Sequence, residues 1–146
     1  MNLVAHKETE LEYVLEDQVG YLLRLASQRH SVIFQKHAVA GMTPTQFTTL
    51  IRVAEMGEVS QNHLGRLAAM DVATIKGVVD RLRAKDLITS RPDKVDKRRT
   101  VISLTENGNV LVSDLRSTGL IITRETLAPL TPKERVTLAT LLGKIS

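Results

Sequence analysis

Two predicted helices separated by a tight turn restrict the fold of this chain more than any other feature of its sequence. Ser60 can cap a short helix from Gln61 to Ala68, because serine is a preferred residue at helix starts. Asp71 can cap a longer helix from Val72 to about Lys85 in the same way. This spacing is typical of a helix-turn-helix, whose second helix enters the major groove of duplex DNA.

The second of these helices has two different faces. Its aliphatic side chains, Ile75, Val78, Val79 and Leu82, fall on one face and are expected in the core. The opposite face carries Ala73, Gly77, Asp80 and Ala84, flanked by Thr74, Lys76 and Arg81. A face that is small in its middle and basic or hydroxylic at its edges suits a helix lying close to base edges. Asp80 is expected to pair with Lys76 or Arg83, which lie four and three residues away.

Gly77 lies in the middle of the same helix, where glycine costs roughly 1 kcal/mol relative to alanine. One explanation is a close approach of the backbone to DNA. The other is drift at an exposed site that tolerates glycine. The sequence does not decide between the two.

A hairpin with a basic loop follows directly. Leu87 to Arg91 and Arg99 to Leu104 are predicted strands, and the seven residues 92–98 form the loop between them. From Arg81 to Arg99 the chain carries eight basic and three acidic residues, a net charge of +5, whereas the whole chain carries only +4. Positive charge this concentrated indicates a polyanionic partner.

The hairpin is interpreted as the wing of a winged helix. Arg98, or Arg99 beside it, is expected to enter the minor groove, where narrow A·T regions concentrate negative potential. Asp96 lies two residues before Arg98 and is expected to hold its side chain in place. The alternative is an ordinary solvated run of charges, but the position next to a capped helix-turn-helix favours the wing.

Four further helices make the predicted fold mainly α. They run from Glu10 to about His37, from a Thr43 cap to about Met56, from a Thr105 cap through "NVLVSDLRSTGLIITRETL", and from a Thr131 cap to about Lys144. The first of them has a broad apolar face that needs a partner helix to cover it. The predicted fold class is therefore a winged helix-turn-helix with a two-stranded β wing and a helical dimerisation region.

Composition excludes several classes of function. A length of 146 residues indicates one compact domain, or one domain with an oligomerisation arm. The absence of cysteine excludes disulfides and thiolate chemistry. We find no phosphate-binding glycine loop, no nucleophile–base pair and no metal-ligand spacing among the four histidines, so neither an enzyme nor a zinc sensor is expected. The N-terminus is not typical of a signal peptide, and no apolar stretch approaches the ~20 residues of a membrane span. These features predict a cytoplasmic protein with no cofactor, no metal and no membrane partner.

Val59 to Gly108 resembles the MarR family of bacterial transcriptional regulators. The matching motifs are "VVDRL" (Val78–Leu82), "DLI" (Asp86–Ile88), "RPD" (Arg91–Asp93), the D-x-R of Asp96–Arg98, "SLTENG" (Ser103–Gly108) and, in the family's second helix, "MTPTQF" (Met42–Phe47). The resemblance covers about Gly20 to the C-terminus. Lys76 and Gly77 depart from the family, because many members have a hydroxyl residue and an arginine there.

The resemblance implies a homodimer on a pseudo-palindromic operator in double-stranded DNA. It divides one domain, residues 1–146, into dimerisation helices at 10–40 and 106–146 and a DNA-binding lobe at 43–104. The expected DNA-binding residues are Ser60, Gln61, Ala73, Thr74, Lys76, Gly77, Arg81, Lys94, Lys97, Arg98 and Arg99.

The resemblance also implies a repressor released by a small aromatic carboxylate or phenol. The stretch around "GMTPTQF" is further similar to repressors of nicotinate or related aromatic-acid breakdown, so a nicotinate derivative is a candidate effector. By position, the pocket comprises Ser27, His30, Phe47 and Ile51, and Arg29 joins it because an arginine in an apolar stripe favours an anion.

Each ligand residue has a simpler interpretation. His30 can be a surface or interface histidine, Arg29 can pair with the partner chain, and Phe47 can be plain core. Two alternatives for the whole chain also stay open, a repressor that needs no ligand and a winged-helix module that docks onto protein. The docking module does not explain the +5 concentrated on the helix and wing.

Overall fold

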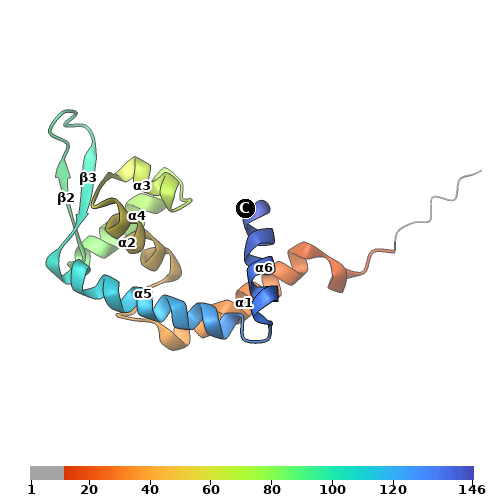
Figure 1. Ribbon diagram of the computed structural model, residues 1–146. Coiled ribbons are helices and arrows are strands. Elements are labelled where there is room, and N and C mark those ends of the chain that lie inside the picture. The colour runs from red at the N-terminus through yellow and green to blue at the C-terminus, as the bar shows by residue number, and fades with distance from the viewer. Residues whose placement is uncertain (1–11) are drawn as a thin grey trace, which may run out of the picture.

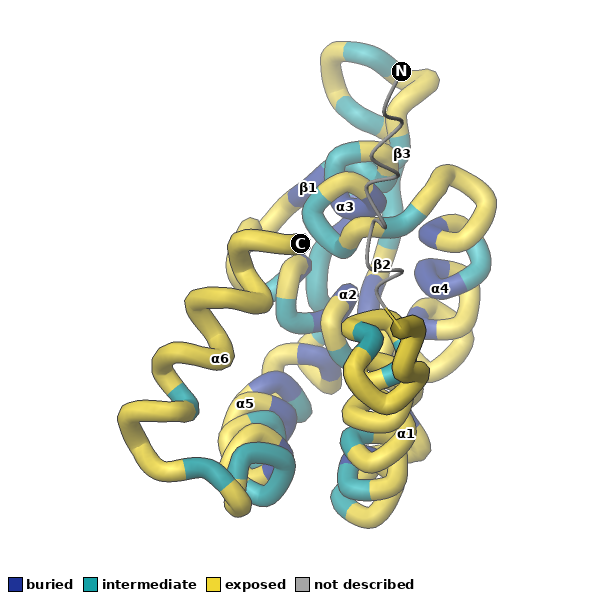
Figure 2. Tube along the Cα trace, turned by 90° about the vertical axis from the view of Figure 1, so that its right-hand side faces the viewer, coloured by how far each residue is buried: buried dark blue, intermediate teal, exposed yellow. Residues whose placement is uncertain are grey.

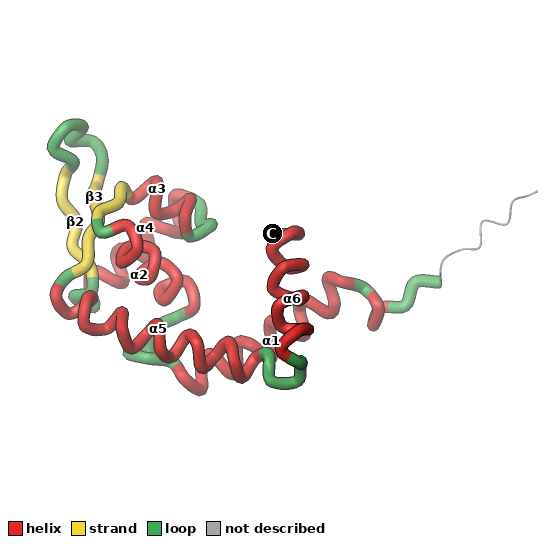
Figure 3. Tube along the Cα trace, in the orientation of Figure 1, coloured by secondary structure: helices red, strands yellow, loops and turns green. Residues whose placement is uncertain are grey.

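The protein is mostly helical in the computed structural model, which describes residues 12–146 (Figures 1 and 3). In chain order the elements are a 3-10 turn at Leu15–Asp17, α1 at Val19–His37, α2 at Pro44–Met56, β1 at Glu58–Ser60, α3 at Gln61–Leu67, α4 at Val72–Ala84, β2 at Ile88–Pro92, β3 at Thr100–Leu104, α5 at Glu106–Thr126 and α6 at Pro132–Lys144. The predicted fold class, a mainly α winged helix-turn-helix, is confirmed.

Side-chain caps begin α2 to α6 at the predicted residues. Thr43 and Thr131 each form a full capping box with the residue three positions later, and a proline occupies the first helical position of both helices. Ser60, Asp71 and Thr105 each accept a hydrogen bond from the backbone N–H three residues on. The caps fix where these helices begin, and hence which face of each one meets the core.

The first helix is shorter than predicted. It begins at Val19, and Gln18, which separates it from the preceding 3-10 turn, has an extended backbone (φ −80°, ψ 131°). The Gln18 side-chain amide donates to the carbonyl oxygen of Val14 at 2.8 Å, which closes the turn instead of continuing the α-helical ladder. The predicted start at Glu10 lies outside the described residues.

The sheet contains the two predicted wing strands and a third strand, β1, that was not predicted. The strand order is β1-β3-β2, both pairings are antiparallel, and β1 joins through Ser60 opposite Val101. A strand of three residues is too short for its alternation to be visible in the sequence, and it exists here because β3 supplies its hydrogen-bond partners. The wing strands β2 and β3 lie within one residue of their predicted bounds.

The aliphatic core lies in the lobe formed by α2, α3, α4 and the sheet (Figure 2). Its most buried side chains, all at most 1% exposed, include Leu50, Val53, Leu64, Ile75, Val79, Leu82, Ile102 and Leu115. Leu115 belongs to α5, so this helix also contributes to the core of the lobe. The core holds α4 by one face and leaves its other face outside.

The foot of the wing is fastened to the start of α5. Asp86 adopts a left-handed backbone (φ 58°), and its carbonyl oxygen accepts from the Thr105 hydroxyl at 2.6 Å. Its carboxylate accepts from the Asn107 amide at 2.7 Å. Gly108 then passes so close to Leu87 that a Cβ there would lie 2.1 Å from the Leu87 carbonyl oxygen. These contacts fix the direction in which the hairpin leaves the lobe.

The other end of α5 leads to α6, which stands apart from the lobe (Figure 1). No residue of α6 is buried, whereas α1 packs along α5. Among residues 12–146, every helix is too short or too polar to cross a lipid bilayer.

Candidate nucleic-acid interface

The outward face of α4 lies free of the core, as its pattern predicted. Ile75, Val78, Val79 and Leu82 are at most 3% exposed, whereas Ala73, Thr74, Lys76 and Arg81 are exposed. Gly77 lies between them on a half-buried surface, and a Cβ placed on it would have no atom within 4 Å. Packing within the protein therefore does not require a glycine at this position.

Acidic residues hold the backbone and the cations of α4 in place. The Asp71 carboxylate accepts the backbone N–H of Thr74 at 2.7 Å, and hydrogen bonds from Thr74 hold the pKa of Asp71 below its usual value. Asp80 pairs with both predicted partners, Lys76 at 3.2 Å and Arg83 at 3.4 Å. No ion pair within residues 12–146 involves Arg81, which leaves its guanidinium available to an anion.

The tip of the wing is ordered by two aspartates. Asp93 closes the loop, since its N–H donates to the Arg99 carbonyl oxygen at 2.9 Å and its carboxylate accepts the N–H of Val95 at 2.9 Å. Asp96 accepts from the backbone N–H of Arg98 at 3.1 Å and from Nε of the same residue at 3.2 Å, as predicted. Hydrogen bonds from Arg98, first from its backbone and then from its side chain, lower the pKa of Asp96.

The basic side chains of the loop stay exposed, although Asp96 pairs with Arg98 and Arg99. Lys94 and Lys97 form no ion pair in the part of the chain that the structure describes, and Arg98 is 92% exposed along its side chain. The loop thus presents positive charge on a backbone that is already ordered before any partner binds.

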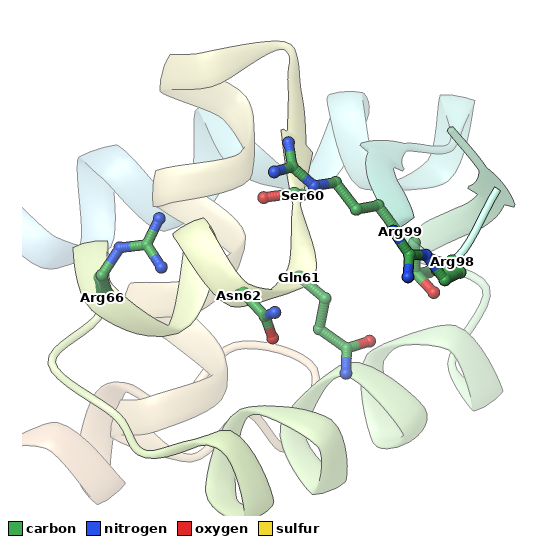
Figure 4. Close-up of a pocket in the computed structure, with 7 residues that line it drawn as sticks. Ser60, Gln61, Asn62, Arg66, Arg98 and Arg99 are labelled. Carbon is green, nitrogen blue, oxygen red and sulfur yellow. The ribbon is translucent and has the colours of Figure 1, made fainter. Parts of the chain in front are cut away.

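A hollow of about 290 Å³ lies between α3 and the loop end of the wing (Figure 4). It is lined by Ser60, Gln61, Asn62, Arg66, Arg98, Arg99 and Thr100. Ser60, Gln61, Arg98 and Arg99 were predicted to contact DNA, but Asn62, Arg66 and Thr100 were not. The hollow exists because β1 pairs with β3, so a reading of the sequence without β1 could not find it.

The predicted ligand residues fall into two groups. Arg29 and His30 belong to α1 and contact the C-terminal end of α5. The Arg29 guanidinium donates to the carbonyl oxygens of Thr126 and Glu125, and His30 Nδ1 lies 2.8 Å from the Thr126 hydroxyl. A small, mostly apolar pocket between α1, α5 and α6 is lined partly by His30. Ser27, also on α1, is exposed.

The second group lies on α2, where Phe47 and Ile51 pack against the edge of the core. The Phe47 ring meets Phe34 of α1 edge-on, with ring centroids 5.7 Å apart. It also lies against Gly119 of α5, where a Cβ would come within 3.0 Å of the ring. Phe34, one helical turn after His30, therefore connects the two groups.

Glu125, a carboxylate at the end of α5, was not predicted as a functional residue. It accepts from His37 Nε2 at 2.7 Å and from Lys36 Nζ at 3.4 Å. The hydrogen bond with His37 is the main reason why the pKa of Glu125 is lowered. Within residues 12–146 no three histidines, cysteines or carboxylates are grouped so that they could hold a metal ion.

Comparison with known proteins agrees with this geometry. The MarR family profile matches residues 40–99. The chain is 39% identical to NicR, an HTH-type transcriptional repressor of Pseudomonas putida, over 91% of this chain and 85% of that protein. The solved structure of Bordetella bronchiseptica BpsR, whose DNA binding is regulated by 6-hydroxynicotinic acid, is similar with a TM-score of 0.86 and 36% identity over 91% of this chain and 96% of that one. PcaV of Streptomyces coelicolor, solved with its natural ligand, gives a TM-score of 0.86 and 25% identity over 91% of this chain and 94% of that one.

Proposed function

Since this chain belongs to the MarR family of transcriptional regulators, we propose that it is a homodimeric repressor released from its operator by a small aromatic acid. Its relatives NicR and PcaV are transcriptional regulators and not enzymes. The observation that carries the DNA half of this proposal is the joint exposure of the α4 face and the ordered basic wing. A regulator of this kind would work in the cytoplasm, on the chromosome.

In the proposed complex α4 lies in the major groove and the wing follows the backbone. Thr74, Lys76 and Arg81 would reach base edges or phosphates from the exposed face of α4, while Ala73 and Gly77 would let the helix approach closely. Lys94 and Lys97 would meet phosphates, and Arg98 would enter the minor groove. Ser60, Gln61 and Arg99 would contact the backbone beside the wing.

A second copy of the chain is the proposed cover for α1 and α6. Leucines on both helices, among them Leu22, Leu23, Leu141 and Leu142, are 37 to 53% exposed. Together with Val19 and Ile145 they line one apolar groove. Covering it with the same helices of a partner would bury this surface and place two α4 helices on a pseudo-palindromic site.

The proposed effector is a nicotinate derivative or a related aromatic acid, in line with the ligand of BpsR. Its ring would lie between α1 and α2 against Phe47 and Ile51, and its polar groups would meet Ser27 and His30. Its carboxylate would take Arg29 from the α5 carbonyl oxygens that this side chain now contacts. Such an exchange would loosen the end of α5 from α1.

The test is a gel-shift titration of DNA from upstream of the protein's own gene, repeated with 6-hydroxynicotinate, nicotinate and salicylate. Specific binding with a steep salt dependence, released by one of these acids, is the expected result. Specific binding that no acid disturbs would leave a repressor without this class of effector. Binding to no duplex at low salt would contradict the proposal and favour a protein-docking module.

A further inference from the structure

Every residue that lines the hollow between α3 and the wing offers at least one hydrogen-bond donor. The lining comprises three arginines, two amides and two hydroxyls, and it contains no carboxylate. We infer that this hollow seats one phosphate group of the DNA backbone, with Arg66 on the α3 side and Arg99 on the wing side. Arg98, which also lines the hollow, keeps the place in the minor groove proposed for it. The inference rests on the proposed DNA-binding function and adds Arg66, Asn62 and Thr100 to the interface.

Charge around the hollow is unbalanced in favour of an anion. Asp96 is the carboxylate nearest the wing arginines, at 3.2 Å from Arg98 Nε and 3.9 Å from Arg99 Nε. Arg66 takes part in no ion pair between residues 12 and 146, and its side chain is exposed. Three guanidinium groups therefore face one carboxylate, which leaves a net charge of +2. One phosphodiester, at −1, neutralises half of this charge.

The polar groups between the arginines are also arranged to donate. Ser60 Oγ accepts the backbone N–H of His63 at 3.3 Å, so the hydroxyl hydrogen is free to point into the hollow. In Figure 4, Ser60, Gln61 and Asn62 lie between Arg66 on one side and Arg98 and Arg99 on the other. A guanidinium presents parallel N–H donors that match two phosphate oxygens, so arginines on two sides define the position of the group.

The hollow joins the two parts of the DNA-binding lobe. Ser60 ends β1 opposite Val101 of β3, which brings the first residues of α3 beside Arg99 and Thr100. A phosphate held there would contact the helix-turn-helix and the wing simultaneously. It would therefore set the position of the wing on the same DNA that α4 reads. The volume of about 290 Å³ equals roughly ten water molecules at about 30 Å³ each, which leaves room for the phosphate and its residual water.

The first test is the salt dependence of operator binding by Arg66→Ala. One lost phosphate contact lowers the slope of log K against log salt by about 0.9, so a dimer with two such seats should lose about 1.8. We expect at least about 10-fold weaker binding, equally for all operator sequences, because a phosphate contact carries no base preference. Arg66→Lys should keep most of the slope. Arg116→Ala removes the same charge from an exposed position on α5, outside the hollow, and should leave the slope unchanged.

The second test locates the phosphate on the DNA. A scan that replaces single phosphates by neutral methylphosphonate should find one linkage per half-site that weakens binding of the wild type but not of Arg66→Ala. Asn62→Asp, which adds a carboxylate to the lining, should weaken binding much more than Asn62→Ala. Circular dichroism of each variant establishes that it is folded.

An Arg66→Ala protein with the wild-type slope, or a scan that affects wild type and variant equally at every linkage, would overturn the phosphate seat. These outcomes leave operator binding by the wild type intact, so they refute the seat and not the repressor. Failure of the wild type itself to bind duplex DNA is the separate result that refutes the proposed function.

Discussion

At Gly108 the first turn of α5 passes so close to the chain before β2 that no side chain fits. A Cβ would lie 2.1 Å from the Leu87 carbonyl oxygen, which is backbone and has no rotamer to change. Gly108→Ala is therefore expected to lower the free energy of unfolding by about 3 kcal/mol, the upper part of the range for overpacking. Urea unfolding measures this loss, and a variant within 1 kcal/mol of wild type would show that the wing foot can move aside.

Gly77 is the opposite case and separates the two explanations for a glycine in α4. Because a Cβ there has no neighbour within 4 Å, Gly77→Ala should stabilise the protein by about 0.5–1 kcal/mol in urea unfolding. If the backbone approaches DNA closely, the same variant should bind the operator more weakly although it folds better. Unchanged affinity would identify Gly77 as a tolerant surface position.

At the scale of elements, the wing loop depends on Asp96. Asp96→Ala raises the net charge by one, yet we expect weaker operator binding, because the loop loses the acceptor that orders Arg98 and Arg99. Gel-shift titration at constant salt distinguishes the loss of loop order, which weakens binding, from the gain of positive charge, which strengthens it. Tighter binding by Asp96→Ala would mean that the carboxylate merely competes with DNA for the arginines.

The elements differ in how far the sequence could predict them. Local chemistry determines the caps at Thr43, Ser60 and Asp71 and the two faces of α4, so these were predictable without knowledge of the fold. β1 was not, because three residues become a strand only when β3 lies beside them. The hollow beside the wing was missed for the same reason. The late start of α1, at Val19, depends on one side-chain hydrogen bond by Gln18, which periodicity does not reveal.

The contact between α1 and the end of α5 should depend on pH. The pKa of Glu125 lies below its usual value of 4.5, chiefly because of its hydrogen bond with His37 and then that with Lys36. A lowered carboxyl pKa means stability that is present above the usual value and lost as pH falls through the lowered one. The Tm of wild type should therefore exceed that of Glu125→Gln at pH 6, and the two should converge as the pH falls below 4. A difference in Tm between the two proteins that stays constant across this pH range would contradict the lowered pKa of Glu125.

At the scale of the whole molecule, α5 connects the two proposed functions. Its first turn holds the foot of the wing through Thr105 and Gly108, and its last turn meets Arg29, His30 and His37 of α1. A helix is stiff along its axis, so a change at one end of α5 shifts the other end relative to the lobe. An effector near α1 could thus change the distance between the two wings of a dimer without contacting DNA.

The dimer itself is tested at α6, whose apolar side chains have no cover within the described chain. Leu141 is 53% exposed in the groove between α1 and α6. Fully burying an exposed leucine is worth about 1.5–3 kcal/mol, so burying the exposed half of Leu141 in both protomers is worth about 1.5–3 kcal/mol together. Leu141→Lys should therefore weaken dimerisation by at least about 10-fold. Light scattering should then show a monomer at micromolar concentration, and operator binding should become weak and dependent on the square of protein concentration. Val95→Lys is the matched control, because it changes a valine at the wing tip that is 95% exposed. This variant should keep the molecular mass of a dimer in light scattering. A Leu141→Lys protein that stays dimeric would show that the dimer interface does not include this part of α6.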